Sequence, residues 1–201
     1  MTRRPLVIVF ARAPRLGRVK TRLARGAGAS AALRFHRLTL AAIVRRLARS
    51  GRWETRIATT PDRDAGRGRG WSRGIALAKQ GDGDLGTRML RAIAAAGRRP
   101  VAIVGSDVPA LDAAAITRAL ALLAANEVVL GPSGDGGYWL LGWRGSRPSL
   151  RLFAGVRWST PHALADTRAR LGRRRLALAD RLDDVDDAAA YARWLRPSPS
   201  A

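Results

Sequence analysis

The sequence has no cysteine, only two histidines and only two lysines among its 37 basic residues. The absence of cysteine excludes disulfides, thiolate metal sites and cysteine nucleophiles. The histidines, His36 and His162, are not accompanied by serine and aspartate in a recognisable order, so triad chemistry has little support. No apolar run approaches the ~20 residues that cross a bilayer, and we expect a cytoplasmic protein without a membrane span.

Acidic residues are also scarce. There are 15 of them against 37 basic residues, which leaves a formal net charge of +22. Such a charge attracts polyanions, whether nucleotides, nucleic acids or anionic membranes. The arginines are spread along the whole chain and form no stripe, which is more typical of a compositional bias than of a nucleic-acid footprint. A nucleic-acid-binding protein is therefore an alternative and not the main interpretation.

Apolar runs of strand length alternate with helical patterns along the chain. The first run, residues 5–11, is continuously apolar, which favours a strand buried on both faces over a signal peptide. Further strands are expected at 53–60, 75–80, 100–107 and 126–133, after the glycines of 131–142, and from residue 176. Helices are expected at 21–50, after 80–86, and at 112–125, 160–172 and 188–196, with a loop or poorly formed helix at 62–74.

This alternation predicts an α/β sandwich with a mainly parallel sheet. No repeat or low-complexity linker divides the chain, so we expect one domain over residues 1–196, followed by a tail at 197–201. In sheets of this kind the ligand binds beyond the carboxyl ends of the strands. The segments that follow the expected strands are therefore the candidates for chemistry.

The first expected strand leads into a basic loop, FARAPRLGRVKTRLA (10–24). Gly17 permits a tight turn, and the next helix begins among cations, where its free N–H groups favour an anion. These cations are Arg18, Lys20 and Arg22. The spacing is not that of a Walker A loop. The segment is interpreted either as a phosphate-binding loop or as a solvated basic face.

A second glycine-rich segment, QGDGDLGTRM (80–89), directly follows Lys79. Its glycines let the backbone approach a ligand closely. Both lysines of the chain therefore stand at candidate ligand loops. With only two of them, chance survival in an arginine-rich composition explains their positions equally well.

Several aspartates stand where a metal ligand is expected. Asp107 follows a buried apolar strand in VAIVGSDVPAL (101–111), which suits a ligand of a hard cation such as Mg²⁺ or a cap of the next turn. Four more aspartates fall within five residues, at 183, 184, 186 and 187. They suit either a metal or the favourable start of a helix, and one aspartate can serve both purposes.

A third glycine-rich segment is GPSGDGGYWLLG (131–142), in which three glycines surround Asp135. Large side chains would obstruct this turn. Tyr138 and Trp139 either stack on a base or sugar, or belong to the core beside a hairpin turn.

These five segments, in this order, resemble the family described as radical-SAM/selenodomain-associated transferase 1, within the GT-A-like nucleotide-diphospho-sugar transferase superfamily. The resemblance runs from Val7 to about Leu195. Its most specific parts are GRVKTRLA, GDLGTRM, GSDVPAL, GPSGDGGYWLLG and the WSTPHAL stretch at 158–164. It implies a three-layer α/β/α sandwich with a mixed, mainly parallel sheet.

The resemblance also implies roles for individual residues. Phosphate and nucleotide contacts are expected from the basic loop and the second segment: Arg12, Gly17, Arg18, Lys20, Arg22, Gly83, Asp84, Gly86 and Arg88. The acceptor or sugar side is expected at Asp135, Gly136, Gly137 and Tyr138. Asp107 is the expected metal ligand, joined by Asp186 because DVDD (184–187) resembles a C-terminal element of related nucleotidyltransferases. The expected catalytic residues are Lys20, Asp107 and Asp135.

The leading hypothesis is then a transferase that depends on Mg²⁺ (or Mn²⁺) and takes a nucleotide donor, glycosyltransferase-like with an NDP-sugar. One alternative is a nucleotidyltransferase that uses an NTP and releases pyrophosphate. Another is a non-catalytic nucleotide- or nucleic-acid-binding protein. The expected partners are the nucleotide donor and a small-molecule acceptor, and the sequence specifies neither the acceptor nor the oligomeric state.

Overall fold

The computed structural model describes residues 4–65, 74–145 and 147–196. Within them lie seven strands, six α-helices and a short 3₁₀ helix at Asp62–Asp64. The strands are β1 (Leu6–Arg12), β2 (Glu54–Thr60), β3 (Ala76–Lys79), β4 (Val101–Gly105), β5 (Val128–Pro132), β6 (Tyr138–Trp143) and β7 (Leu176–Leu178). The helices are α1 (Thr21–Ala27), α2 (Ala29–Arg49), α3 (Leu85–Ala95), α4 (Ala113–Leu122), α5 (Ala163–Leu171) and α6 (Ala188–Leu195).

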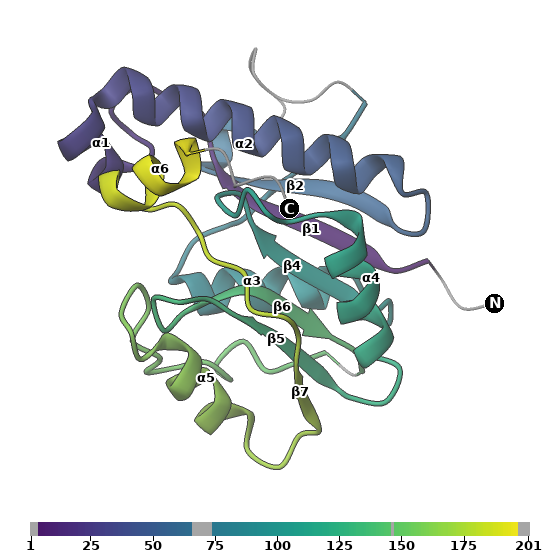
Figure 1. The fold of residues 1–201 in the computed structure, drawn as a ribbon. Coiled ribbons are helices and arrows are strands. Elements are labelled where there is room, and N and C mark those ends of the chain that lie inside the picture. Colours follow the sequence, from purple (N-terminus) through teal and green to yellow (C-terminus); the bar gives the residue numbers. More distant parts are fainter. Residues whose placement is uncertain (1–3, 66–73, 146, 197–201) are drawn as a thin grey trace.

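All seven strands form one sheet in the order β3-β2-β1-β4-β6-β5-β7 (Figure 1). β6 runs antiparallel to its neighbours β4 and β5, and the other pairings are parallel. Only residues 133–137 separate β5 from β6, which allows a hairpin but not the long crossover that a parallel return needs. The expected mixed, mainly parallel sheet is confirmed.

Helices cover both faces of the sheet, so the fold has three layers (Figure 1). Successive residues of a strand point to opposite faces. Val7 and Val9 accordingly belong to a core cluster with residues of α2 and α4, whereas Leu6 and Ile8 belong to a cluster with residues of α3 and α5. All four side chains are buried. The continuous apolar run of β1 therefore reflects burial on both faces.

Two helix boundaries differ from the prediction. The pattern at 21–50 is two helices, because Gly28 has a φ of 87° and ends α1 before α2 begins. α5 begins at Ala163 and not at residue 160, because Thr160 forms a turn in which its Oγ1 accepts a hydrogen bond from His162 N at 3.2 Å. Of the loop expected at 62–74, residues 66–73 lie outside the described residues.

A small third cluster packs residues from the first two helices against residues from the C-terminal part of the chain. Leu23 of α1, Phe35 of α2 and Val185 are buried together, and Tyr191 of α6 packs against them. The rings of Phe35 and Tyr191 meet edge to face with their centroids 5.6 Å apart, a favourable aromatic geometry. This packing holds α6 beside α1, as Figure 1 shows.

Gly86, near the start of α3, lies against the segment that follows β6. A Cβ atom at this position would lie 2.5 Å from Cζ2 of Trp158 and 2.9 Å from Cβ of Phe153. Both distances are shorter than a packed core tolerates without movement. The close approach of α3 and the 153–158 segment therefore requires glycine at position 86.

We expect Gly86→Ala to lower the free energy of unfolding by about 1–3 kcal/mol, the usual cost of overpacking. Helix propensity alone predicts the opposite sign, a gain of up to about 1 kcal/mol. Urea unfolding measures the difference, and Trp158→Leu in both backgrounds is the control. The smaller side chain removes the contact with Cζ2 and leaves that with Phe153, so it should remove part of the penalty. A stabilising Gly86→Ala would contradict this explanation.

Candidate active site

Asp107 lies two residues beyond the end of β4, at the carboxyl edge of the sheet. Gly105 makes room for it, since a Cβ there would lie 2.8 Å from Asp107 Oδ1. The Asp107 side chain is one-third exposed. The strand thus delivers a carboxylate to the sheet edge, where ligands of such folds bind.

The chain between β7 and α6 runs along the same edge. Three of its backbone N–H groups donate to carbonyl oxygens within β5 or just beyond the end of β4, at 2.9–3.2 Å: Ala179 to Leu130, Leu182 to Pro132 and Val185 to Asp107. These bonds fix the register of the acidic segment against the sheet. They decide which of its aspartates lie next to Asp107.

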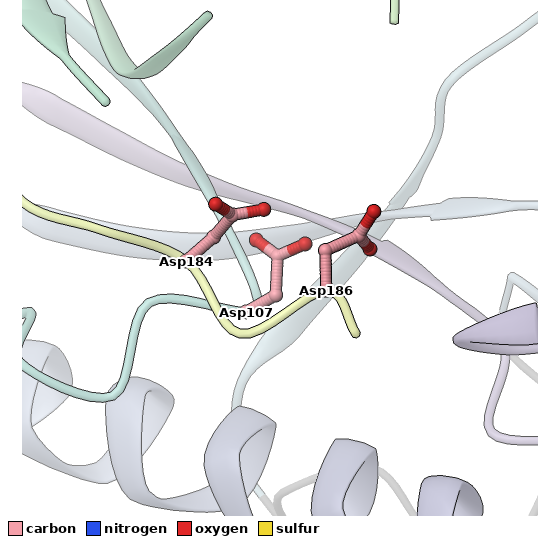
Figure 2. Close-up of side chains that lie close together, drawn as sticks. All are labelled: Asp107, Asp184 and Asp186. Atoms are coloured by element: carbon pink, nitrogen blue, oxygen red, sulfur yellow. The ribbon is translucent and has the colours of Figure 1, made fainter. Parts of the chain in front are cut away.

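The four aspartates at 183, 184, 186 and 187 have different partners. Asp183 accepts a hydrogen bond from Gly134 N at 2.8 Å, and Asp187 caps α6 by accepting one from Ala190 N at 2.7 Å. Asp184 and Asp186 instead join Asp107. One carboxylate oxygen of each lies within 4.8 Å of those of the other two, and the three side chains point to the same side (Figure 2). Helix capping and the acidic cluster therefore use separate aspartates.

Lys20, the residue before α1, places its ammonium in this cluster. Its Nζ donates to Asp107 Oδ2 at 2.7 Å and to Asp186 Oδ1 at 3.1 Å, and its side chain is only 7% exposed. Its backbone is left-handed, with φ 48° and ψ 51°, which costs a non-glycine residue about 1–2 kcal/mol. Strain of this kind is typical of functional positions.

Burial and ion pairing set the charges of the cluster. Burial alone would lower the pKa of Lys20, but Asp107 and then Asp186 outweigh it and raise that pKa above its ordinary value. Burial, reinforced by the neighbouring Asp107, raises the pKa of Asp184 to about 6. Asp184 has no hydrogen-bond or ion-pair partner among the residues that the structure describes.

The composition of the cluster fits a hard divalent cation. Its donors are carboxylate oxygens, which Mg²⁺ and Mn²⁺ prefer. A cation already stands between two of the carboxylates, in the form of the Lys20 ammonium. One more cation, Arg22, reaches Asp186 Oδ2 at 3.1 Å from an exposed position. The residues present can therefore hold a metal.

An open cleft of about 360 Å³ adjoins the cluster. Its lining includes Asp184 and Asp186 together with Asp135 from the turn between β5 and β6. Asp135 Oδ1 accepts hydrogen bonds from Ser133 Oγ at 2.6 Å and from Gly137 N at 2.9 Å, which orient the carboxylate. The turn after β5 thus contributes a carboxylate to the same cleft as the acidic cluster.

Two other residues expected on the acceptor side have packing partners. Gly136 has a φ of 82°, and a Cβ there would lie 2.2 Å from the carbonyl oxygen of Pro161. The Tyr138 hydroxyl lies 3.4 Å from Thr167 Oγ1, and burial raises its pKa well above the ordinary range. Tyr138 is not among the residues that line the cleft. Its contacts belong to the core under α5.

The basic loop lies beside the cluster but is only partly engaged in it. Arg12 ends β1, and its carbonyl oxygen accepts a hydrogen bond from Nε2 of the buried His36 at 2.9 Å. Gly17 has a φ of 70°, which supports the predicted tight turn. The Arg18 side chain is exposed. Lys20 and Arg22 are the members of this loop that contact the acidic cluster.

The second glycine-rich segment (80–89) lies farther from the Asp107 cluster than the basic loop does. It follows β3, which is three strands from β4, or about 14 Å at the usual strand spacing. Asp84 caps α3 by accepting a hydrogen bond from Thr87 N at 2.7 Å, which lowers the pKa of its carboxyl. Arg88 Nε donates to Gly83 O at 2.8 Å. Lys79, on the edge strand, is exposed and does not approach the Asp107 cluster.

Asp184 is the member of the cluster that sequence reasoning did not select individually. Its signal was its spacing of two residues from Asp186. In an extended segment such residues point to the same side. Where 183–187 runs along the sheet edge, Asp184 and Asp186 both lie beside Asp107.

Residues 43–160 match the profile of DUF2064, a family described as an uncharacterised protein conserved in bacteria. The chain belongs to this family. The matched region includes Asp107 and Asp135 but not Lys20, Asp184 or Asp186. No curated protein sequence matches this DUF2064 protein. Among its described residues, no helix is long and apolar enough to cross a bilayer.

Solved structures resemble the DUF2064 protein over most of its length. A candidate nucleotide-diphospho-sugar transferase from Desulfovibrio desulfuricans G20 is 26% identical, with a TM-score of 0.82 over 92% of this chain and 84% of that one. Rv0371c of Mycobacterium tuberculosis H37Rv, in complex with manganese, is 18% identical, with a TM-score of 0.58 over 97% and 99%. A CMP:2-keto-3-deoxy-manno-octonic acid synthetase with CTP is 13% identical, with a TM-score of 0.57 over 95% and 96%. The GT-A-like fold is thereby established.

We expect Asp184→Asn to stabilise the metal-free protein at pH 8. Folding raises the pKa of Asp184 from 3.8 to about 6, so ionisation of this carboxyl lowers the free energy of unfolding. The loss grows as the pH rises from about 3.8 to about 6 and is complete above that range. After a discount for partial exposure, the gain is on the order of 1 kcal/mol, or about 2–4 °C in melting temperature.

Thermal melts in EDTA at pH 8 and pH 3.5 measure this effect. At pH 3.5 the carboxyl of Asp184 is mostly protonated in both states, so the variant and the parent should melt alike. A gain of equal size at both pH values would contradict the electrostatic origin.

Proposed function

We propose that this DUF2064 protein is a divalent-metal-dependent transferase that takes a nucleotide donor, with Mg²⁺ as its metal. The main support is one juxtaposition at the carboxyl edge of the sheet. There the carboxylates of Asp107, Asp184 and Asp186 lie beside the cations Lys20 and Arg22 at the start of a helix. When bound, the metal would neutralise charge that develops on the donor phosphates.

The charges along the sheet edge indicate how a nucleotide donor is oriented. Asp84, at the start of α3, would repel a phosphate but can accept hydrogen bonds from a base or a ribose hydroxyl. Lys20 and Arg22 contact the acidic cluster beside β4. β4 is three strands, or about 14 Å, from β3. We infer that the base lies near Gly83, Asp84 and Arg88, with Gly86 packed beneath them against Trp158, and that the phosphates lie near the basic loop.

The residues of the chain then act mainly through position and charge. Arg12, Arg18 and Lys20 hold phosphate oxygens and keep the donor in line with the acceptor. The three aspartates of the cluster hold the metal. Asp135, which lines the 360 Å³ cleft, orients the acceptor and accepts its proton.

Two chemistries suit such a site. In glycosyl transfer, an acceptor hydroxyl bonds to the anomeric carbon of an NDP-sugar, its proton passes to a base, and the nucleoside diphosphate leaves. The Desulfovibrio structure, described as a candidate for that donor class, supports this reaction. In nucleotidyl transfer, an acceptor phosphate oxygen bonds to the α-phosphorus of an NTP, and pyrophosphate leaves. The basic loop next to the acidic cluster supports this second reaction.

We place the chain in the radical-SAM/selenodomain-associated transferase 1 group, on the segments quoted above. We also interpret residues 1–196 as one domain, since every described strand belongs to the same sheet.

We expect an NTP or NDP-sugar to raise the melting temperature in the presence of Mg²⁺, because a ligand of the folded state stabilises it by mass action. At a hundred times Kd the gain is about 2.7 kcal/mol. Asp107→Asn should abolish the Mg²⁺-dependent part of the shift. Asp180→Asn, in an exposed ion pair with Arg118, is the matched control and should retain it.

A panel of NTPs and NDP-sugars with and without Mg²⁺ makes this measurement. If no nucleotide shifts the melting temperature with metal present, the proposed function is wrong. For a donor that binds, release of pyrophosphate or of nucleoside diphosphate in the presence of candidate acceptors decides between the two chemistries.

A further inference from the structure

We propose that Lys20 is an exchangeable cation that occupies the metal position until metal and donor arrive together. In the metal-free protein its ammonium bridges Asp107 and Asp186; on metal binding it moves to the donor phosphates. This inference rests on the proposed function and deepens it. It predicts that the metal binds poorly to the protein without a phosphate ligand.

The geometry of the bridge makes the two cations mutually exclusive. Lys20 Nζ lies 2.7 Å from an oxygen of Asp107 and 3.1 Å from one of Asp186. A divalent ion bound to the same carboxylates would lie about 2.0–2.6 Å from their oxygens. Two cations that share the same pair of carboxylates repel one another strongly in a partly buried site. The ammonium must therefore leave when the metal binds.

An ammonium that leaves needs a new partner. The Lys20 side chain is 7% exposed, so it lacks the solvation that would compensate for the lost ion pairs. Among the described residues, its ion pairs are with Asp107 and Asp186. A donor phosphate beside the basic loop would supply the replacement anion. Metal binding is therefore opposed without a donor and favoured with one.

Arg22 does not share this role. It contacts the other oxygen of Asp186, Oδ2, and its side chain is 62% exposed. It can turn into solvent at little cost when the metal binds. Of the cations that the structure describes, Lys20 alone lies between carboxylates from the segments after β4 and before α6. The coupling between metal and donor is thus assigned to Lys20.

The test compares Mn²⁺ binding by the full chain and by Lys20→Met. Electron paramagnetic resonance of free Mn²⁺ gives the affinity for the metal alone. We expect Lys20→Met to bind Mn²⁺ about tenfold more tightly, a typical size for coupling between sites. Calorimetry with the preformed Mn²⁺–pyrophosphate complex should show the opposite change, about tenfold weaker binding.

Two further variants make the result specific. Arg25→Met removes one positive charge from an exposed position of α1 and should change Mn²⁺ affinity less than twofold. Lys20→Asn removes the ammonium with a residue that tolerates the left-handed backbone, and it should reproduce Lys20→Met if the latter folds poorly. Circular dichroism and thermal melts verify the fold of each variant.

Several outcomes would overturn the exchange. These are unchanged or weaker Mn²⁺ binding by both Lys20 variants, a gain no larger than that of Arg25→Met, or parallel strengthening of Mn²⁺ and Mn²⁺–pyrophosphate binding. If the parent and all variants bind Mn²⁺ equally, only the exchange fails and the proposed metal site remains. If no form binds Mn²⁺ even with pyrophosphate, the proposed function fails with it.

Discussion

The ion pairs of Lys20 connect three parts of the chain that are far apart in sequence. Lys20 precedes α1, Asp107 follows β4, and Asp186 precedes α6. Buried or half-buried charges are costly unless each has a partner, so these three segments stabilise one another's positions. The backbone bond from Val185 to Asp107 and the ring contact of Phe35 with Tyr191 hold the same arrangement from outside the cluster. Contacts between the protein's own groups thus hold the carboxyl edge together.

Much of this fold is predictable because the strands are buried on both faces. A run such as residues 5–11 leaves little choice of structure, and the position of Asp107 follows directly from the end of its strand. The antiparallel β6 also follows from a short, glycine-rich connection. What the sequence does not give is the register of the 179–187 segment along the sheet edge. That register, set by long-range backbone bonds, distinguishes Asp184 and Asp186 from Asp183 and Asp187.

Glycines in a motif were harder to interpret than the charged residues beside them. Gly86 and Gly136 lie in segments expected to bind ligand, and both have protein atoms where a side chain would be. Trp158 and Phe153 fill the space at one, and Pro161 fills it at the other. Sequence reasoning treats a glycine-rich turn as room for a ligand, although room for another part of the chain gives the same pattern. The long-range contacts of the 153–161 segment cannot be read from local spacing.

The choice of lysine at position 20 has a physical reason in a chain that otherwise uses arginine. An ammonium is a compact point charge on a flexible stem, and it can bridge oxygens of two separate carboxylates. A guanidinium prefers to bind one carboxylate through two parallel bonds, and its planar fork holds that geometry rigidly. With carboxylate oxygens within 4.8 Å of one another, a small cation suits the space better than a wide one. The compact charge of the ammonium lets Lys20 occupy the position of a metal ion, and its flexible stem lets it move away when a metal ion replaces it.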